Sequence, residues 1–300
     1  MTVNAIIEGL APIHDRILSF AVPERDVRGR VVRLDASIAA ILAAHDYPPA
    51  LARLLGEALV VTALLGATLR ENGGGLTLQA QSDGPVSLLV CDYNAGQLRG
   101  YLMGDAETES GDLATMFGSG HLAITLDPTD ASERYQGIVP LEGASIADAI
   151  EQYFRSSEQL PTLIRTAFAP DAATGPSAGG LLLQYLPRGE EGRARLFAED
   201  DGTAEPEDWS HMRILAETVT AAELTDTALL EEQLLWRLFH EEEVRLSPGP
   251  TPTRGCRCSV AHIKDVITRF PEAERADMRG DDGMIGVDCQ FCSKTWRIDA

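Results

Sequence analysis

Four of the five cysteines of this 300-residue chain lie within its last 50 residues. They form a C-x-C and a C-x-x-C pair, 30 residues apart, and they are Cys256, Cys258, Cys289 and Cys292. Thiolates are soft ligands that favour zinc, and four of them close a tetrahedral site. A segment this short, without a long apolar run, needs such a cross-link in order to fold. The spacing therefore predicts a small C-terminal domain, residues 256–300, that binds one zinc ion.

Two other side chains near the cysteines are weaker candidates as ligands. His262 follows Cys258 by four residues, but it falls on the solvated face of the helix expected there. Asp288 precedes Cys289, but thiolate outcompetes carboxylate for zinc. We therefore expect the four cysteines alone to be the metal ligands.

The C-x-C pair leaves open whether zinc is held permanently. A disulfide between residues two apart closes a small, strained ring, and strained disulfides are the labile ones. The sequence thus permits a site that an oxidant could dismantle. A static structural site is the competing interpretation, and composition alone favours it, because zinc held by four thiolates is usually structural.

Charge is unevenly distributed along the chain. The formal net charge is −21, yet residues 251–300 carry eight basic and eight acidic side chains. The acidic excess of the first 250 residues argues against nucleic acid and against an anionic membrane as partners. Residues 247–253 read SPGPTPT, which neither a helix nor a central strand accommodates. We expect a core domain at 1–188, a middle segment at 189–246, a Pro-rich joint at 247–255 and the zinc domain at 256–300.

The sequence also indicates a compartment. The first residues lack a basic stretch followed by an apolar one, so a secretory signal is not expected. The most apolar stretch, residues 58–69, is too short to span a bilayer and is expected to be a buried helix. We therefore expect a cytoplasmic protein, in which thiols are normally reduced.

The core domain is expected to be α+β, with helices and an antiparallel sheet. Helical spacing and period-two runs, separated by turn signals such as SDGP at 82–85, define its elements. The expected helices are 35–45, 49–70 and 145–156. The expected strands are 76–81, 86–92, 97–102, 121–126, 135–141 and 181–186.

The middle segment is expected to be helical but only marginally stable. Residues 189–245 contain 16 acidic and five basic side chains. Helical patterns cover 208–219 and 225–243, and the second carries a leucine stripe from which Glu231 and Glu232 are expected to point away. Three adjacent glutamates at its end oppose the helix dipole.

Five further residues invite a functional interpretation that their context weakens. Ser177 lies in a GPSAG sequence, but a nucleophile elbow needs a strand before the serine and a helix after it. His45 is more simply a helix cap than a general base. Cys91 falls in an expected strand and should be buried and inert. Trp209 and Trp236 are expected in the core.

Several motifs follow the order in which they occur in one bacterial chaperone family. They are HDYP at 45–48, SDGP at 82–85, ERYQG at 133–137, LEG at 141–143, SEQLPT at 157–162, AGGLLLQ at 178–184 and FHEEEVR at 239–245. Together with the cysteine spacing, they make nearly the whole chain resemble the redox-regulated heat-shock chaperones of about 33 kDa.

The resemblance implies a mechanism for this chain. The reduced protein would hold one Zn²⁺ in the four thiolates and be inactive. Oxidation would form the disulfides Cys256–Cys258 and Cys289–Cys292, release the metal and disorder residues 189–246. The exposed surface would then hold unfolded or partly folded client proteins during oxidative stress, without ATP or catalysis, and the active form would be a homodimer.

Three other functions compete with this one. The protein could be a constitutive holdase with a structural zinc site. It could be a thiol oxidoreductase that uses Cys289 and Cys292. It could also be a zinc ribbon that docks on nucleic acid, although the net charge of −21 opposes this.

Overall fold

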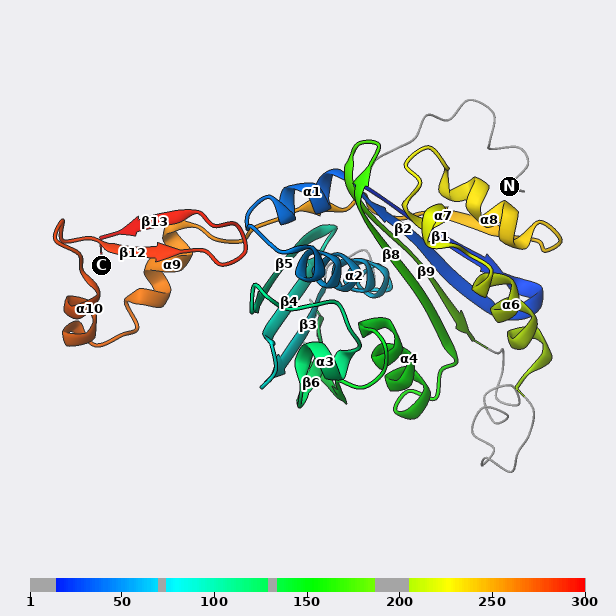
Figure 1. Cartoon of the computed structure of the whole chain (residues 1–300), viewed down its shortest axis with the longest axis horizontal. Helices are drawn as coiled ribbons and strands as arrows, with labels where there is room; N and C mark the ends of the chain where they lie inside the picture. Colours follow the sequence, from blue (N-terminus) through cyan, green and yellow to red (C-terminus); the bar gives the residue numbers. More distant parts are fainter. Residues whose placement is uncertain (1–14, 70–73, 129–133, 187–204, 300) are drawn as a thin grey trace.

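The computed structural model describes residues 15–69, 74–128, 134–186 and 205–299, which form two large sheets, a hairpin and several helices (Figure 1). The antiparallel sheet A has the order β10 (Arg245–Pro248), β1 (Arg16–Val22), β2 (Val27–Leu34), β9 (Gly175–Tyr185), β8 (Thr162–Ala172). Sheet B has the order β11 (Thr253–Arg254), β5 (Gln97–Gly104), β4 (Val86–Asn94), β3 (Gly74–Ser82), β6 (Gly120–Pro128), β7 (Tyr135–Pro140). Only β11 runs parallel to its neighbour among these described strands.

The helices are distributed over the whole chain, and a hairpin ends it. The helices of the core are α1 (Ala36–Leu42), α2 (Pro49–Gly66), α3 (Leu113–Phe117), α4 (Ile146–Ser156) and the short 3-10 turn Pro23–Arg25. The middle helices are α6 (Glu207–Glu217), α7 (Ala221–Thr225) and α8 (Glu231–Phe239). The C-terminal unit contains α9 (Val260–Ile267), α10 (Glu272–Met278) and the hairpin of β12 (Ile285–Asp288) and β13 (Thr295–Ile298).

The α+β class with antiparallel sheets is confirmed. The expected strands coincide with β3 to β7 and with part of β9, and the expected helices with α1, α2 and α4, to within a few residues at the ends. The turn motif at 82–85 joins β3 to β4, where the hydroxyl of Ser82 donates to the carbonyl of Val86 at 2.5 Å. The strands β1, β2 and β8 were not expected.

Helix α2 fills the layer between the sheets and contacts both of them (Figure 1). Glycines allow this close approach: a Cβ at Gly66 would lie 2.4 Å from the ring of Tyr93 in sheet B, and one at Gly56 would lie 2.6 Å from the ring of Phe168 in sheet A. The helix is long and apolar enough to cross a membrane, but 72% of that stretch is buried. It is a core helix, as the sequence predicted.

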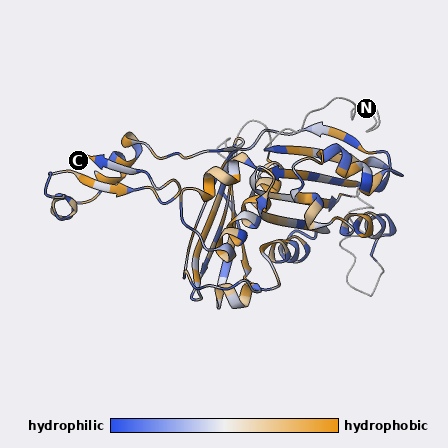
Figure 2. Ribbon diagram, turned by 45° about the horizontal axis from the view of Figure 1, so that its top comes forward, coloured by the Kyte–Doolittle hydropathy of each residue, from blue (hydrophilic) through white to orange (hydrophobic). Residues whose placement is uncertain are grey.

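Sheet A is buried on both faces, which explains why three of its strands lack a clear alternating pattern. Ile17 and Val32 face α2 and the main core, whereas Leu18 and Val31 face a second core. That second core includes Met212 and Phe239 of the middle helices. Apolar residues accordingly run along the strands of both sheets (Figure 2).

The middle helices differ from the expectation in two ways. The pattern at 225–243 is not one helix, because α7 ends at Thr225 and α8 begins at Glu231. Trp209 is buried as expected, but Trp236 is 43% exposed, so its place in the core was predicted wrongly. The charged stretch 188–204 lies outside the described residues.

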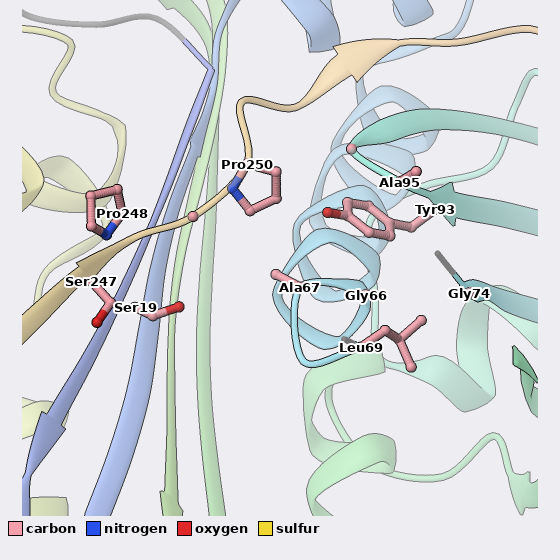
Figure 3. Close-up of a pocket in the computed structure, with 12 residues that line it drawn as sticks. Ser19, Gly66, Ala67, Leu69, Gly74, Tyr93, Ala95, Ser247, Pro248 and Pro250 are labelled. Carbon is pink, nitrogen blue, oxygen red and sulfur yellow. The ribbon is translucent and has the colours of Figure 1, made fainter. Parts of the chain in front are cut away.

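The Pro-rich joint belongs to both sheets. It enters as β10 on the edge of sheet A and leaves as β11 on the edge of sheet B. Proline is tolerated on edge strands, because no second neighbour needs its missing N–H group. A cavity of about 530 Å³ lies at the crossing, with Ser247 and Pro248 on one side and Tyr93 and Leu69 on the other (Figure 3). The joint is therefore a strap between the sheets, and the C-terminal unit projects beyond it (Figures 1 and 2).

Candidate metal centre

The four C-terminal cysteines come from two loops. Cys256 and Cys258 lie between β11 and α9, and Cys289 and Cys292 lie in the turn between β12 and β13. Backbone hydrogen bonds close this turn, because the amide of Cys289 donates to the carbonyl of Lys294 at 3.0 Å and the amide of Ser293 donates to that of Cys289 at 2.8 Å. Ser293 has a φ of 55°, so the turn includes one residue in the left-handed region.

The four sulfur atoms form one cluster, and all of them lie within 4.8 Å of one another. The Sγ of Cys256 is 3.2 Å from that of Cys258 and 3.5 Å from that of Cys289, and the Sγ atoms of Cys258 and Cys292 are 3.5 Å apart. Zinc–sulfur bonds of about 2.3 Å in a tetrahedron place sulfurs roughly 3.8 Å apart. The cluster therefore fits a metal ion that accepts four thiolates.

Hydrogen bonds within the cluster give its thiols different pKa values. Burial raises the pKa of Cys256, but hydrogen bonds from the Cys258 backbone and the other thiols outweigh it and lower the pKa to about 7. Burial and hydrogen bonding to the other thiols raise the pKa of Cys258 to about 12. Without a metal, negative charge therefore concentrates on Cys256.

The unit around the cluster has little apolar core of its own. Ile267, Ile285 and Ile298 are its buried apolar residues within the described part of the chain. The hydroxyl of Ser259 caps α9 by accepting from the amide of His262 at 3.2 Å. Three isoleucines cannot hold about 45 residues together without a further cross-link.

The weaker ligand candidates lie outside the cluster. His262 is exposed on α9, as expected. Asp288 is also exposed, and its carboxylate accepts from the hydroxyl of Thr295 at 2.6 Å. Neither residue joins the cysteine cluster, as the sequence predicted.

His45 has a role that the sequence did not suggest. It lies beyond the end of α1, and its Nδ1 is 3.3 Å from the hydroxyl of Ser293, next to Cys292. That hydroxyl also donates to the carbonyl of Ala44 at 2.5 Å. His45 lies near the end of α1, as predicted, where its amide donates to the carbonyl of Leu42 at 3.0 Å, and its side chain also contacts the C-terminal unit. The sequence could not show this contact with Ser293, because the two residues are far apart along the chain.

Buried ion pairs hold the middle helices on sheet A. The carboxylate of Glu232 accepts from Arg16 at 2.5 and 2.8 Å, and Glu231 lies 3.2 Å from Arg33. Both glutamates are almost fully buried, so the expectation that they point away from the apolar stripe was wrong. The two arginines are register partners on β1 and β2. Because these strands were not predicted, the ion pairs of the arginines with the glutamates could not be predicted either.

The remaining candidates are structural. The hydroxyl of Ser177, buried within β9, donates to the carboxylate of Asp35 at 2.6 Å. It has neither the helix nor the exposure of a nucleophile elbow. Cys91 is fully buried in β4, and burial raises the pKa of its thiol far above the ordinary value. It is inert, as expected.

Comparisons with known proteins extend over the whole described chain. The family model for Hsp33 protein matches residues 15–299. The 33 kDa chaperonin of Caulobacter vibrioides is 40% identical, with 96% of this chain and 95% of the relative covered. That of Shewanella woodyi is also 40% identical, with 95% and 93% covered. The crystal structure of the Thermotoga maritima 33 kDa chaperonin has the same fold, with a TM-score of 0.75, 22% identity and 95% of both chains covered.

Proposed function

The chain belongs to the Hsp33 family and is a chaperone rather than an enzyme, and from this premise we propose that it is an ATP-independent holdase that oxidation activates. In the proposed resting state, Cys256, Cys258, Cys289 and Cys292 hold one Zn²⁺ as thiolates. The observation that carries the proposal is the cluster of four sulfurs within 4.8 Å in a unit whose described residues include three buried apolar side chains. Such a unit depends on its metal for folding.

Oxidation would remove the thiolates in pairs. The two sulfurs of Cys256 and Cys258 lose two electrons to one hydrogen peroxide molecule and form a disulfide. The O–O bond of the peroxide breaks, and two protons complete two water molecules. Cys289 and Cys292 react in the same way. The pairing is supported by the 3.2 Å separation of the first two sulfurs and by the common turn of the second two. Disulfide sulfurs carry no charge, so the loops no longer retain the cation.

The proposed client site is the face of sheet A beneath the middle helices. Leu18, Phe20, Val31 and Leu183 lie on this face and are buried against α6, α7 and α8. The segment between α8 and the cysteine loops is the strap, so unfolding of the C-terminal unit would remove an anchor of α8. Release of the helices would expose a contiguous apolar patch, which unfolded proteins bind. We further propose a cytoplasmic location and a homodimer in the activated state.

The proposal is tested by zinc content and by suppression of client aggregation, measured as light scattering. Reduced protein should contain one zinc per chain and suppress weakly, whereas peroxide-treated protein should release the zinc and suppress strongly. The double variant Cys256→Ser/Cys289→Ser should lose zinc binding and no longer respond to peroxide. Cys91→Ala, which leaves the cluster intact, is the matched control and should respond normally.

Other outcomes would support the competing functions. Equal suppression by the reduced and oxidised proteins would indicate a constitutive holdase with a structural metal. Turnover of a disulfide substrate that depends on Cys289 and Cys292 would indicate an oxidoreductase. Peroxide activation that survives in the double variant would show that the switch lies elsewhere.

A further inference from the structure

A buried carboxylate lies on the outer face of sheet B, where the cysteine loops meet the core. Thr77, Asp92 and Arg99 occupy one row across β3, β4 and β5. The carboxylate of Asp92 accepts from the hydroxyl of Thr77 at 2.7 Å and from Nε of Arg99 at 2.8 Å. Asp92 is only 5% exposed. The adjoining row, which contains Leu76, belongs to the main core, so this row points away from α2.

Both cysteine loops contact this row. Arg257, between Cys256 and Cys258, donates to the carboxylate of Asp92. Phe291, between Cys289 and Cys292, lies beneath the guanidinium of Arg99, whose carbon is 4.1 Å from the ring centroid. A cavity of about 410 Å³ lies at this junction, and Asp92, Arg99, Arg257 and Phe291 all line it.

We infer that Asp92 is a positioning residue for the metal centre and docks both cysteine loops on sheet B in their reduced geometry. One carboxylate orients Arg257 directly and Phe291 through Arg99. The inference rests on the proposed function for the identity of the metal. It adds a route by which the cysteines communicate with the core, separate from the strap, the middle helices and the contact of Ser293 with His45.

The direction of the effect follows from the geometry. Forming the Cys256–Cys258 disulfide requires the two sulfurs to approach from 3.2 Å to about 2.05 Å, and this moves the backbone that carries Arg257. A contact that exists only in the reduced state stabilises that state and opposes activation. Loss of this contact should therefore accelerate zinc release by peroxide, without changing the cysteines themselves.

The strength of the contact comes from the burial of Asp92, since the Arg257 side chain is itself 49% exposed. A carboxylate that accepts several hydrogen bonds, two of them from arginines, away from water is held more firmly than an exposed ion pair. Asp127 offers the contrast, because it lines the same cavity but is 58% exposed and pairs at 3.2 Å with Arg134, which is 66% exposed. Asp127 should contribute little.

The test compares Asp92→Asn with Asp127→Asn as the matched control. Zinc release under a fixed peroxide concentration is followed with a coloured chelator. Asp92→Asn should release zinc about tenfold faster than the wild type, whereas Asp127→Asn should release it at the wild-type rate. Arg257→Gln should also accelerate release, and the double variant Asp92→Asn/Arg257→Gln should not exceed Asp92→Asn, because that variant has already lost the Arg257 contact.

A second measurement does not depend on the metal. The amide of Gly255 donates to the carbonyl of Leu98 at 2.9 Å, close to the contact between Arg257 and Asp92. Hydrogen exchange of the Gly255 amide therefore reports whether the cysteine loops are bound to sheet B in the reduced protein. Asp92→Asn should accelerate this exchange, while near-UV circular dichroism should show an unchanged core. Wild-type rates of zinc release and of exchange in Asp92→Asn would overturn the inference. Absence of zinc from the wild type would overturn the proposed function, and the exchange experiment would still decide the docking.

Discussion

An arginine next to the C-terminal end of β2 joins the core to the middle segment. Arg33 is 3% exposed, and its guanidinium donates to the carbonyl of Leu229 at 2.6 Å and to Glu231 at 3.2 Å. Burial raises the pKa of Glu231, and the charge of Arg33 opposes this rise. The pair thus places two charges in a largely apolar layer, where Arg16 lies 3.5 Å from Glu231 as a second partner.

Replacing Arg33 alone should be costly. Arg33→Met leaves Glu231 buried without its closer partner, and we expect a loss of about 3–5 kcal/mol in the free energy of unfolding, measured in urea. Arg33→Met/Glu231→Leu should recover much of this loss, because apolar residues of similar volume replace both charges. A double variant no more stable than Arg33→Met would contradict this account of the pair.

Glu242 provides a pH dependence of known sign. Burial raises its pKa, but hydrogen bonds from Arg25 and His211 outweigh burial, and the pKa lies below its ordinary value of 4.5. A lowered carboxyl pKa contributes stability above about pH 4.5, and this contribution disappears as the pH falls through the folded-state pKa. The contribution is therefore present at neutral pH.

The expected result is a stability difference that depends on pH. Glu242→Gln should be roughly 1.5 kcal/mol less stable than the wild type at about pH 6, and the difference should shrink as the pH falls to about 3.5. Denaturant unfolding at each pH measures it. The exposed neighbour Glu241 is the control, and Glu241→Gln should show little difference at either pH. A difference for Glu242→Gln that grows in acid would refute the assignment.

At the scale of elements, the contact between α7 and β9 depends on a missing side chain. A Cβ at Gly179 would lie 1.9 Å from the backbone carbonyl oxygen of Leu224 in α7. Real Cβ atoms do not approach so closely, and a backbone atom cannot move away alone. The AGGLLLQ motif at 178–184 therefore includes a glycine against which α7 of the middle segment packs.

Gly179→Ala should loosen α7 from sheet A without unfolding the sheet. Hydrogen exchange should accelerate in α7 and α8, and the reduced protein should suppress client aggregation several-fold better, because the covered face opens without oxidation. Gly286→Ala is the control, since a Cβ there meets nothing within 4 Å. Faster exchange in α7 and α8 without any gain in suppression would place the client site elsewhere.

At the scale of the whole molecule, the two parts of the chain differ in what holds them together. The core has an extended apolar interior on both sides of sheet A, whereas the C-terminal unit has three buried isoleucines among its described residues. The strap and the loop contacts at Asp92 and His45 connect the two parts. The protein should consequently lose its order in steps rather than all at once.

Metal removal should show these steps. A strong zinc chelator with a reductant should abolish hydrogen-exchange protection of the amides in residues 285–298 while β3, β4 and β9 remain protected. Protection should return when zinc is added back, which separates metal loss from irreversible damage. A C-terminal unit that stays protected without metal would show that its apolar core suffices.

The sequence by itself determined the features that depend on local chemistry. Cysteine spacing identified the cysteine cluster, period-two patterns identified strands β3 to β7 of sheet B, and the leucine stripe identified the middle segment as apolar on one face. These signals are readable because ligand spacing and one-sided burial leave a local pattern.

Only the tertiary structure decided the rest. Sheet A is buried on both faces, so β1, β2 and β8 carry no clear alternation, and without them Arg16 and Arg33 could not be paired with Glu231 and Glu232. The contact of Arg257 with Asp92 joins residues 165 positions apart. Such contacts depend on how the sheets are stacked, and no periodicity of a single segment records that arrangement.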